Sequence, residues 1–100
     1  MRFVFDWDPR KAAANLAKHR VSFDEAMTVF RDPLALTIFD PDHSQTEERW
    51  ITLGLSMMAK LLLVVHTHVE ITRDETLIRI ISARRPSRHE ERQYERGSVP

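Results

Sequence analysis

The feature that most constrains the fold is a change of hydrophobic period at Asp32-Pro33. Before this point, the apolar residues recur at helical spacing. After it, apolar segments of strand length follow one another, at residues 34–39, 49–54, 61–68 and 77–83. Short connections favour antiparallel neighbours, because a parallel crossover needs on the order of a dozen residues or more. The sequence therefore predicts an antiparallel meander of about four strands.

Two helices are predicted ahead of this sheet. In the first, Asp8 is the N-cap, Pro9 takes the first helical position, and the helix runs to about His19. The second begins with a capping box formed by Ser22 and Glu25. It continues to the Asp-Pro pair with apolar residues at i, i+3, i+4 and i+7, which marks a buried face.

A third helix is predicted after the strands. Ser87 and Glu90 form another capping box, and the helix is expected to end near Arg96. Residues 2–5 form a candidate edge strand at the front of the chain. Two N-terminal helices packed on one face of the sheet, followed by a C-terminal helix, make an α+β fold. We expect residues 1–100 to form a single domain with one modest core.

Composition narrows the classes of function. No apolar run reaches the roughly 18–20 residues of a membrane span, and no leader pattern precedes the first folded-looking segment, so a cytoplasmic location is expected. Without cysteine, the chain has no thiolate ligands for a metal. It also lacks a Gly-rich phosphate loop, a nucleophile elbow and an H-E-x-x-H helix. These absences argue against nucleotide-dependent transfer, serine hydrolysis and zinc proteolysis.

The charge pattern points to local rather than diffuse anion binding. The formal net charge is +0, which argues against a general nucleic-acid binder held by bulk electrostatics. The stretch from Arg84 to Arg96 nevertheless concentrates arginines at a strand end and along the last helix, and guanidinium groups suit the binding of phosphates. Tyr94 is the one sizeable hydrophobe of this helix, so the helix cannot dock through an apolar stripe and is either a solvated lid or a partner surface, and we favour the partner surface.

Lys18 and His19 end the first helix, and each has two interpretations. Cations at a helix C-terminus compensate the helix dipole, which is a sufficient structural reason for them. In the functional interpretation, Lys18 contacts a phosphate and His19 acts as general acid or base, because histidine titrates near neutral pH. Their polar stripe also holds Lys11 and Asn15, and this slightly favours the functional interpretation.

Two strand arginines are further candidates. Arg49 starts the second strand of the meander, where a surface arginine usually has no special role. Arg79 interrupts the last apolar strand, so it lies either on the solvent face of the sheet or in a partly buried pair. His66 and His68 form an H-x-H pair without an obvious third ligand, which favours sheet-surface histidines over a zinc site.

Taken together and in order, these residues resemble the BrnT toxins of bacterial type II toxin–antitoxin systems. The resemblance covers nearly the whole chain. It rests on Phe5-Asp6-Trp7-Asp8-Pro9 and Lys11, Asn15 and Lys18-His19, Val21-Ser22-Phe23 with Glu25-Ala26, Asp32-Pro33, Glu48-Arg49 before Gly54, and Arg79-Ile80-Ile81-Ser82-Ala83-Arg84 with Ser87, Glu90 and Tyr94.

The resemblance implies a small ribonuclease with a RelE-like fold that cuts RNA and thereby inhibits translation. The RNA that it cuts can be free or bound to the ribosome. It also implies neutralisation by a BrnA-like DNA-binding antitoxin, through which the chain would reach operator DNA. No membrane partner is implied. In such toxins the RNA 2′-hydroxyl attacks its own phosphate, without a metal or cofactor.

That chemistry needs a base, an acid and cations around the phosphorane. The resemblance makes His19 the acid or base and places Lys18, Arg49, Arg79 and Arg84 around the phosphate. Glu90 would orient an arginine or act as base, although its capping role competes with both.

One position departs from the family pattern. Many members carry an arginine directly after the glycine that closes the second strand of the meander, and this chain has Leu55 there. Either a phosphate contact is missing and activity is weakened, or Arg49 supplies the contact. The alternative function is therefore a catalytically weak or inactive module that binds an antitoxin-like partner and acts as co-repressor.

Overall fold

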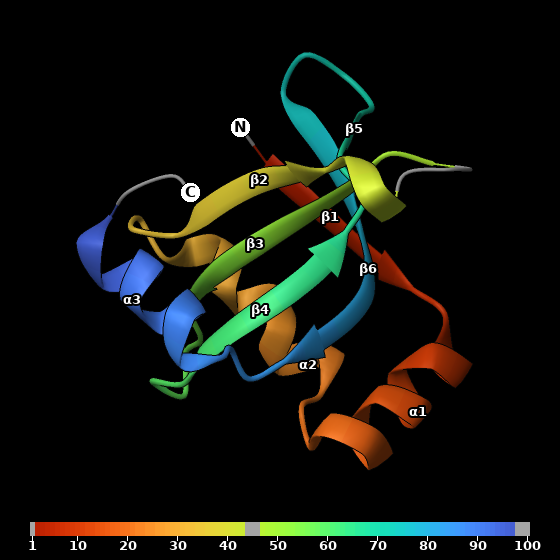
Figure 1. Cartoon of the computed structure of the whole chain (residues 1–100). Coiled ribbons are helices and arrows are strands. Elements are labelled where there is room, and N and C mark those ends of the chain that lie inside the picture. The colour runs from red at the N-terminus through yellow and green to blue at the C-terminus, as the bar shows by residue number, and fades with distance from the viewer. Residues whose placement is uncertain (1, 44–46, 98–100) are drawn as a thin grey trace.

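The computed structural model describes residues 2–43 and 47–97, which form a mixed α+β fold (Figure 1). The elements follow in the order β1 (Arg2–Trp7), α1 (Pro9–His19), α2 (Phe23–Ala26), the 3-10 helix η1 (Met27–Arg31), β2 (Leu36–Asp40), the 3-10 helix η2 (Pro41–His43), β3 (Arg49–Leu55), β4 (Leu61–His66), β5 (Val69–Glu70), β6 (Glu75–Arg84) and α3 (Arg88–Arg96).

The described strands form one six-stranded sheet in the order β1-β6-β4-β3-β2, with β5 paired to β6. The antiparallel meander predicted from the short connections is confirmed for β2, β3, β4 and β6. The predicted count of about four strands is too low. The candidate edge strand is real, extends to Trp7 and runs parallel to β6. The additional strand β5 has only two residues, too few for a period-2 pattern in the sequence.

The second predicted helix is shorter than its pattern suggested. Only Phe23–Ala26 is α-helical, and Met27–Arg31 continues as a 3-10 helix. The Thr28 hydroxyl donates a hydrogen bond to the Glu25 carbonyl at 2.6 Å, and the chain leaves the helix at Asp32, whose N–H donates to the Val29 carbonyl. Of the predicted apolar face, Phe23 and Ala26 are buried, and Met27 and Phe30 are half-buried and pack against the core.

α1, α2 and η1 cover one face of the sheet (Figure 1). Burial of a large aliphatic or aromatic side chain contributes about 1.5–3 kcal/mol, so this layer supplies most of the stabilisation. Gly54 lets η1 approach β3, because a Cβ at this position would lie 3.2 Å from the Val29 carbonyl oxygen. The buried core consists of Val21, Phe23, Ala26, Val29, Leu62, Val64, Ile78, Ile80 and Ala83.

A β-bulge in β6 sets the direction of its last side chains. Val65 pairs with Ser82 but His66 pairs with Ile80, which leaves Ile81 as the extra residue. Because Ala83 belongs to the core, Arg84 points to the opposite face. We call that opposite face the open face of the sheet.

Candidate active site

The strongest polar contact at the open face joins the end of β6 to α3. Arg84 Nη1 and Nη2 donate to Glu90 Oε1 and Oε2 at 2.9 and 3.0 Å, a bidentate ion pair. The side chains are 42% and 22% exposed, so water screens the pair only in part. The hydrogen bond from Arg84 is the main reason why the pKa of Glu90 lies below its usual range, and it raises the pKa of Arg84.

Glu90 also completes the predicted capping box. The Ser87 N–H donates to Glu90 Oε1 at 2.8 Å, and the Ser87 hydroxyl accepts from the Glu90 N–H at 3.3 Å. The same carboxylate therefore caps α3 and orients Arg84. The predicted capping role of Glu90 and its predicted role in orienting an arginine therefore do not exclude each other, because the carboxylate has two oxygens and several lone pairs.

The other end of α3 is held by Tyr94. Its hydroxyl donates to Asp32 Oδ2, which also accepts from the Leu55 N–H at 2.8 Å. Burial and this hydrogen bond raise the pKa of Tyr94 to about 12. Burial acts to raise the pKa of Asp32 too, but the hydrogen bonds from Tyr94, Leu55 and Leu34 outweigh it and lower that pKa. Among residues 88–96, which make up α3, none is buried, so polar contacts position the helix.

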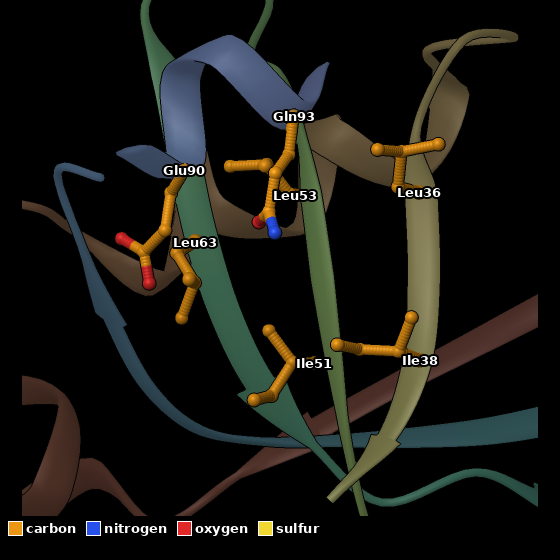
Figure 2. Close-up of a pocket in the computed structure, with 7 residues that line it drawn as sticks. All are labelled: Leu36, Ile38, Ile51, Leu53, Leu63, Glu90 and Gln93. Carbon is orange, nitrogen blue, oxygen red and sulfur yellow. The ribbon is translucent and has the colours of Figure 1, made fainter. Parts of the chain in front are cut away.

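An apolar groove lies between α3 and the open face. Figure 2 shows Gln93 reaching from α3 toward the strands, with Glu90 one turn earlier. The aliphatic lining of the groove comes from β2, β3 and β4 and consists of Leu36, Ile38, Ile51, Leu53 and Leu63. Leu63 pairs in register with Arg84, so the guanidinium stands at the border of the groove. A cation beside an apolar groove offers the anionic part and the apolar part of one ligand adjoining places to bind.

Lys18 and His19 occupy the last turn of α1, where the dipole role predicted for them is available. Asn15 anchors this end of α1 to β6: its Nδ2 donates to the carbonyls of Val21 and Ala83, both at 2.9 Å, and its Oδ1 accepts from the Ala83 N–H at 3.0 Å. The reading of Asn15 as part of a functional polar stripe is therefore wrong, because its amide is buried and fully engaged. The anchor places the C-terminal end of α1 at the same end of the sheet as the end of β6 (Figure 1).

Arg79 and Arg49 lie away from Arg84. Arg79 forms an ion pair with Asp6 of β1, and both side chains are largely exposed, which agrees with the predicted solvent-face placement. It precedes Arg84 by five residues, one of which is the bulge residue Ile81, so the two arginines are about 13 Å apart along the strand. Arg49 pairs in register with Asp40 at the far end of β3. Leu55 is two strands from β6 in the sheet order, so its side chain is not adjacent to Arg84 either.

His66 is a core residue, which corrects the sheet-surface prediction. It is 0% exposed, and burial is the main reason why its pKa is lowered to about 4. Nδ1–H donates to the Thr67 carbonyl at 2.8 Å, so neutral Nε2 accepts from the Thr52 hydroxyl at 2.7 Å. His68 lies beyond β4 and is exposed. In the part of the chain that the structure describes, no cluster of three His, Cys, Asp or Glu residues is arranged to hold a metal.

A sequence model described as "Ribonuclease toxin, BrnT, of type II toxin-antitoxin system" matches residues 7–90. The chain belongs to the BrnT family. The matched segment includes all six candidate residues and ends at Glu90, inside the first turn of α3. The family is one of ribonuclease toxins, and a type II toxin has an antitoxin partner.

The fold of this BrnT-family chain is similar to a crystal structure of the Brucella abortus ribonuclease toxin BrnT. The TM-score is 0.61 at 19% sequence identity, and the alignment covers 88% of this chain and 100% of the Brucella chain. No curated protein matches significantly in sequence. Within residues 2–43 and 47–97, no helix is long and apolar enough to cross a membrane.

Gln93 was not predicted as a site residue, and the contact between Tyr94 and Asp32 was not predicted either. Gln93 lies in the middle of a polar helix, and its position over the groove depends on how α3 packs. Tyr94 did carry a signal, because a single large aromatic residue in an otherwise polar helix needs a contact. Its partner Asp32 is 62 residues away, which no local pattern reveals.

Proposed function

We propose that this BrnT-family chain is the toxin of a type II pair and a metal-independent endoribonuclease. The observation that supports this best is Arg84, which ends β6 beside the apolar groove with both Nη groups aligned by Glu90. A guanidinium oriented in this way can accept a phosphate in place of the carboxylate, because both anions fit its planar fork.

In this reaction the RNA 2′-hydroxyl attacks the adjacent phosphorus and the 5′-oxygen leaves. Arg84 stabilises the charge that develops on the phosphorane oxygens. His19 moves a proton to or from a reacting oxygen, since imidazole is the side chain best matched to neutral pH. Lys18 contributes a further cation from the same turn of α1. Glu90 orients Arg84 before the substrate binds, and once the phosphate has taken its place on the guanidinium the freed carboxylate can act as a base.

Arg49 and Arg79 have a more distant role in this proposal. Both stand away from Arg84, so they bind phosphates flanking the scissile one rather than the phosphorane itself. The partner is a BrnA-like DNA-binding antitoxin, through which the complex reaches operator DNA. Cleavage of mRNA, on or off the ribosome, inhibits translation.

A second candidate function is a non-catalytic module that binds the antitoxin and acts as co-repressor. It is favoured by the separation of Arg49 and Arg79 from Arg84, which leaves few ionisable groups at any one phosphate. It is also favoured by the Arg84–Glu90 ion pair, which satisfies both partners without a ligand.

Incubation of antitoxin-free protein with a 5′-labelled mRNA in EDTA separates the two functions. Wild-type protein should give discrete fragments, and Arg84→Ala should give none. Arg79→Ala is the matched control, because it removes an arginine from the same strand, and it should lower the cleavage rate far less. Intact RNA after incubation with folded wild-type protein, with and without ribosomes, would reject the enzyme in favour of the module.

A further inference from the structure

α3 carries a row of arginines that the contacts of Glu90 and Tyr94 do not use. Arg88, Arg92 and Arg96 repeat every four residues, so they lie along one side of the helix, and all three are exposed. No ion pair involves any of them within the described residues, 2–43 and 47–97. Arg85 is exposed in the same way just before the helix. We call these four residues the basic stripe.

The attachments of α3 fix where the basic stripe points. Glu90 and Tyr94, one turn apart, both face the sheet, through Arg84 and Asp32. Arg92 is two residues from each of them, which is about 200° around an α-helix with 3.6 residues per turn. The basic stripe is therefore turned toward solvent and held there, because the opposite side of the helix is bound.

We propose that the basic stripe binds the backbone of the RNA strand beyond the phosphate held by Arg84. This inference rests on the proposed ribonuclease function, since it extends the same substrate path. Arg85 directly follows Arg84, and the stripe then runs about 12 Å along the helix axis from Arg88 to Arg96. The Cα atoms of Arg88, Arg92 and Arg96 follow one another at about 6 Å along that axis, a spacing that suits contacts of their side chains with successive phosphates of one strand.

The chemistry of the stripe favours RNA over a protein partner. Arginine anchors in protein interfaces stand beside aromatic or aliphatic side chains that form the interface core, and the outward side of α3 presents its arginines without a large apolar side chain next to them. Arginine forks bind phosphates bidentately and do so independently of base sequence. Glu91 and Glu95 border the stripe on one side and repel phosphates, so the strand follows the other side, where His89 is exposed.

The family match does not account for this surface. It ends at Glu90, so Arg92 and Arg96 lie beyond it. The candidate catalytic residues are all within the matched segment, whereas most of the length of the stripe is outside it.

The salt dependence of RNA binding measures how many phosphate contacts the basic stripe makes. The probe is a fluorescently labelled RNA with 2′-O-methyl groups throughout, which has the phosphates but cannot be cleaved. Dissociation constants are measured by anisotropy over a range of KCl concentrations for wild type and for R88Q/R92Q/R96Q. The matched control R2Q/R10Q/R73Q removes three exposed arginines from β1, α1 and the turn before β6.

In a plot of the logarithm of the association constant against log[salt], the wild-type line should fall, and the line of R88Q/R92Q/R96Q should be less steep by about 2. The reason is that each phosphate contact on a single strand contributes about 0.7 to the steepness. The control variant should keep the wild-type slope. Equal slopes for wild type and stripe variant, or wild-type protein that does not bind the probe, would overturn the inference. Wild-type protein that binds the probe but leaves unmodified RNA intact would overturn the ribonuclease proposal alone. A stripe variant that keeps RNA binding but loses antitoxin binding would assign the stripe to the protein partner instead.

Discussion

Replacement of Asn15 by alanine tests whether the junction between α1 and β6 is held by one buried amide. The side chain is 6% exposed and makes three hydrogen bonds, two donated and one accepted. Alanine removes all three and leaves the Val21 and Ala83 carbonyls and the Ala83 N–H without those partners. Water reaches these groups poorly, because Val21 and Ala83 belong to the core.

Each hydrogen bond contributes about 0.5–1.5 kcal/mol net, so the expected loss for three bonds is about 3 kcal/mol. That is a large part of the roughly 5–15 kcal/mol by which a domain of this size is stable. With a urea m-value of about 1–1.5 kcal/mol/M, the unfolding midpoint should fall by roughly 2 M. Equilibrium unfolding in urea, followed by tryptophan fluorescence and far-UV circular dichroism, measures it.

Two further variants separate hydrogen bonding from packing. Asn15→Asp keeps the volume but at neutral pH has no N–H to donate to the two carbonyls, so it should destabilise at least as much as alanine. Lys11→Ala changes an exposed residue one turn earlier and should shift stability by about 0.5 kcal/mol or less. A loss below about 1 kcal/mol for Asn15→Ala would refute this account of the junction.

Three other perturbations have definite expected outcomes. Arg84→Ala should abolish growth inhibition at matched expression while Arg79→Ala retains most of it; full toxicity of the first variant would remove Arg84 from the site. Because His66 has its pKa lowered to about 4 in the fold, from an ordinary 6.5, the unfolded chain binds more protons between these values. Stability should therefore fall by about 3 kcal/mol as pH drops from 6.5 to 4, and in His66→Gln, compared by urea titrations across that range, this slope should largely vanish. Tyr94→Phe should speed amide hydrogen exchange in α3 by about tenfold, since loss of a hydrogen bond near 1.4 kcal/mol loosens only that helix; unchanged exchange would mean that other contacts dock α3.

Much of the local structure follows from residues that are close in sequence. The caps of α1 and α3 were predicted correctly because Asp8 and Ser87 bond to backbone groups two or three residues away. The antiparallel meander was predicted correctly because short connections leave few other topologies. The second helix was overestimated, since Phe23 and Ala26, like Met27 and Phe30, are three residues apart, a spacing that an α-helix and a 3-10 helix both place on one side.

The sequence by itself determined the helix caps, the alternation of the strands and the family, all of which depend on residue type and local spacing. Only the tertiary structure decided which polar side chains meet. Asn15 contacts Ala83 across 68 residues, and Tyr94 reaches Asp32 across 62. The same packing buried His66. The physical reason is that these contacts depend on sheet register, on one bulge and on the docking of helices, which arise from the sum of many distant interactions and leave no local pattern in the chain.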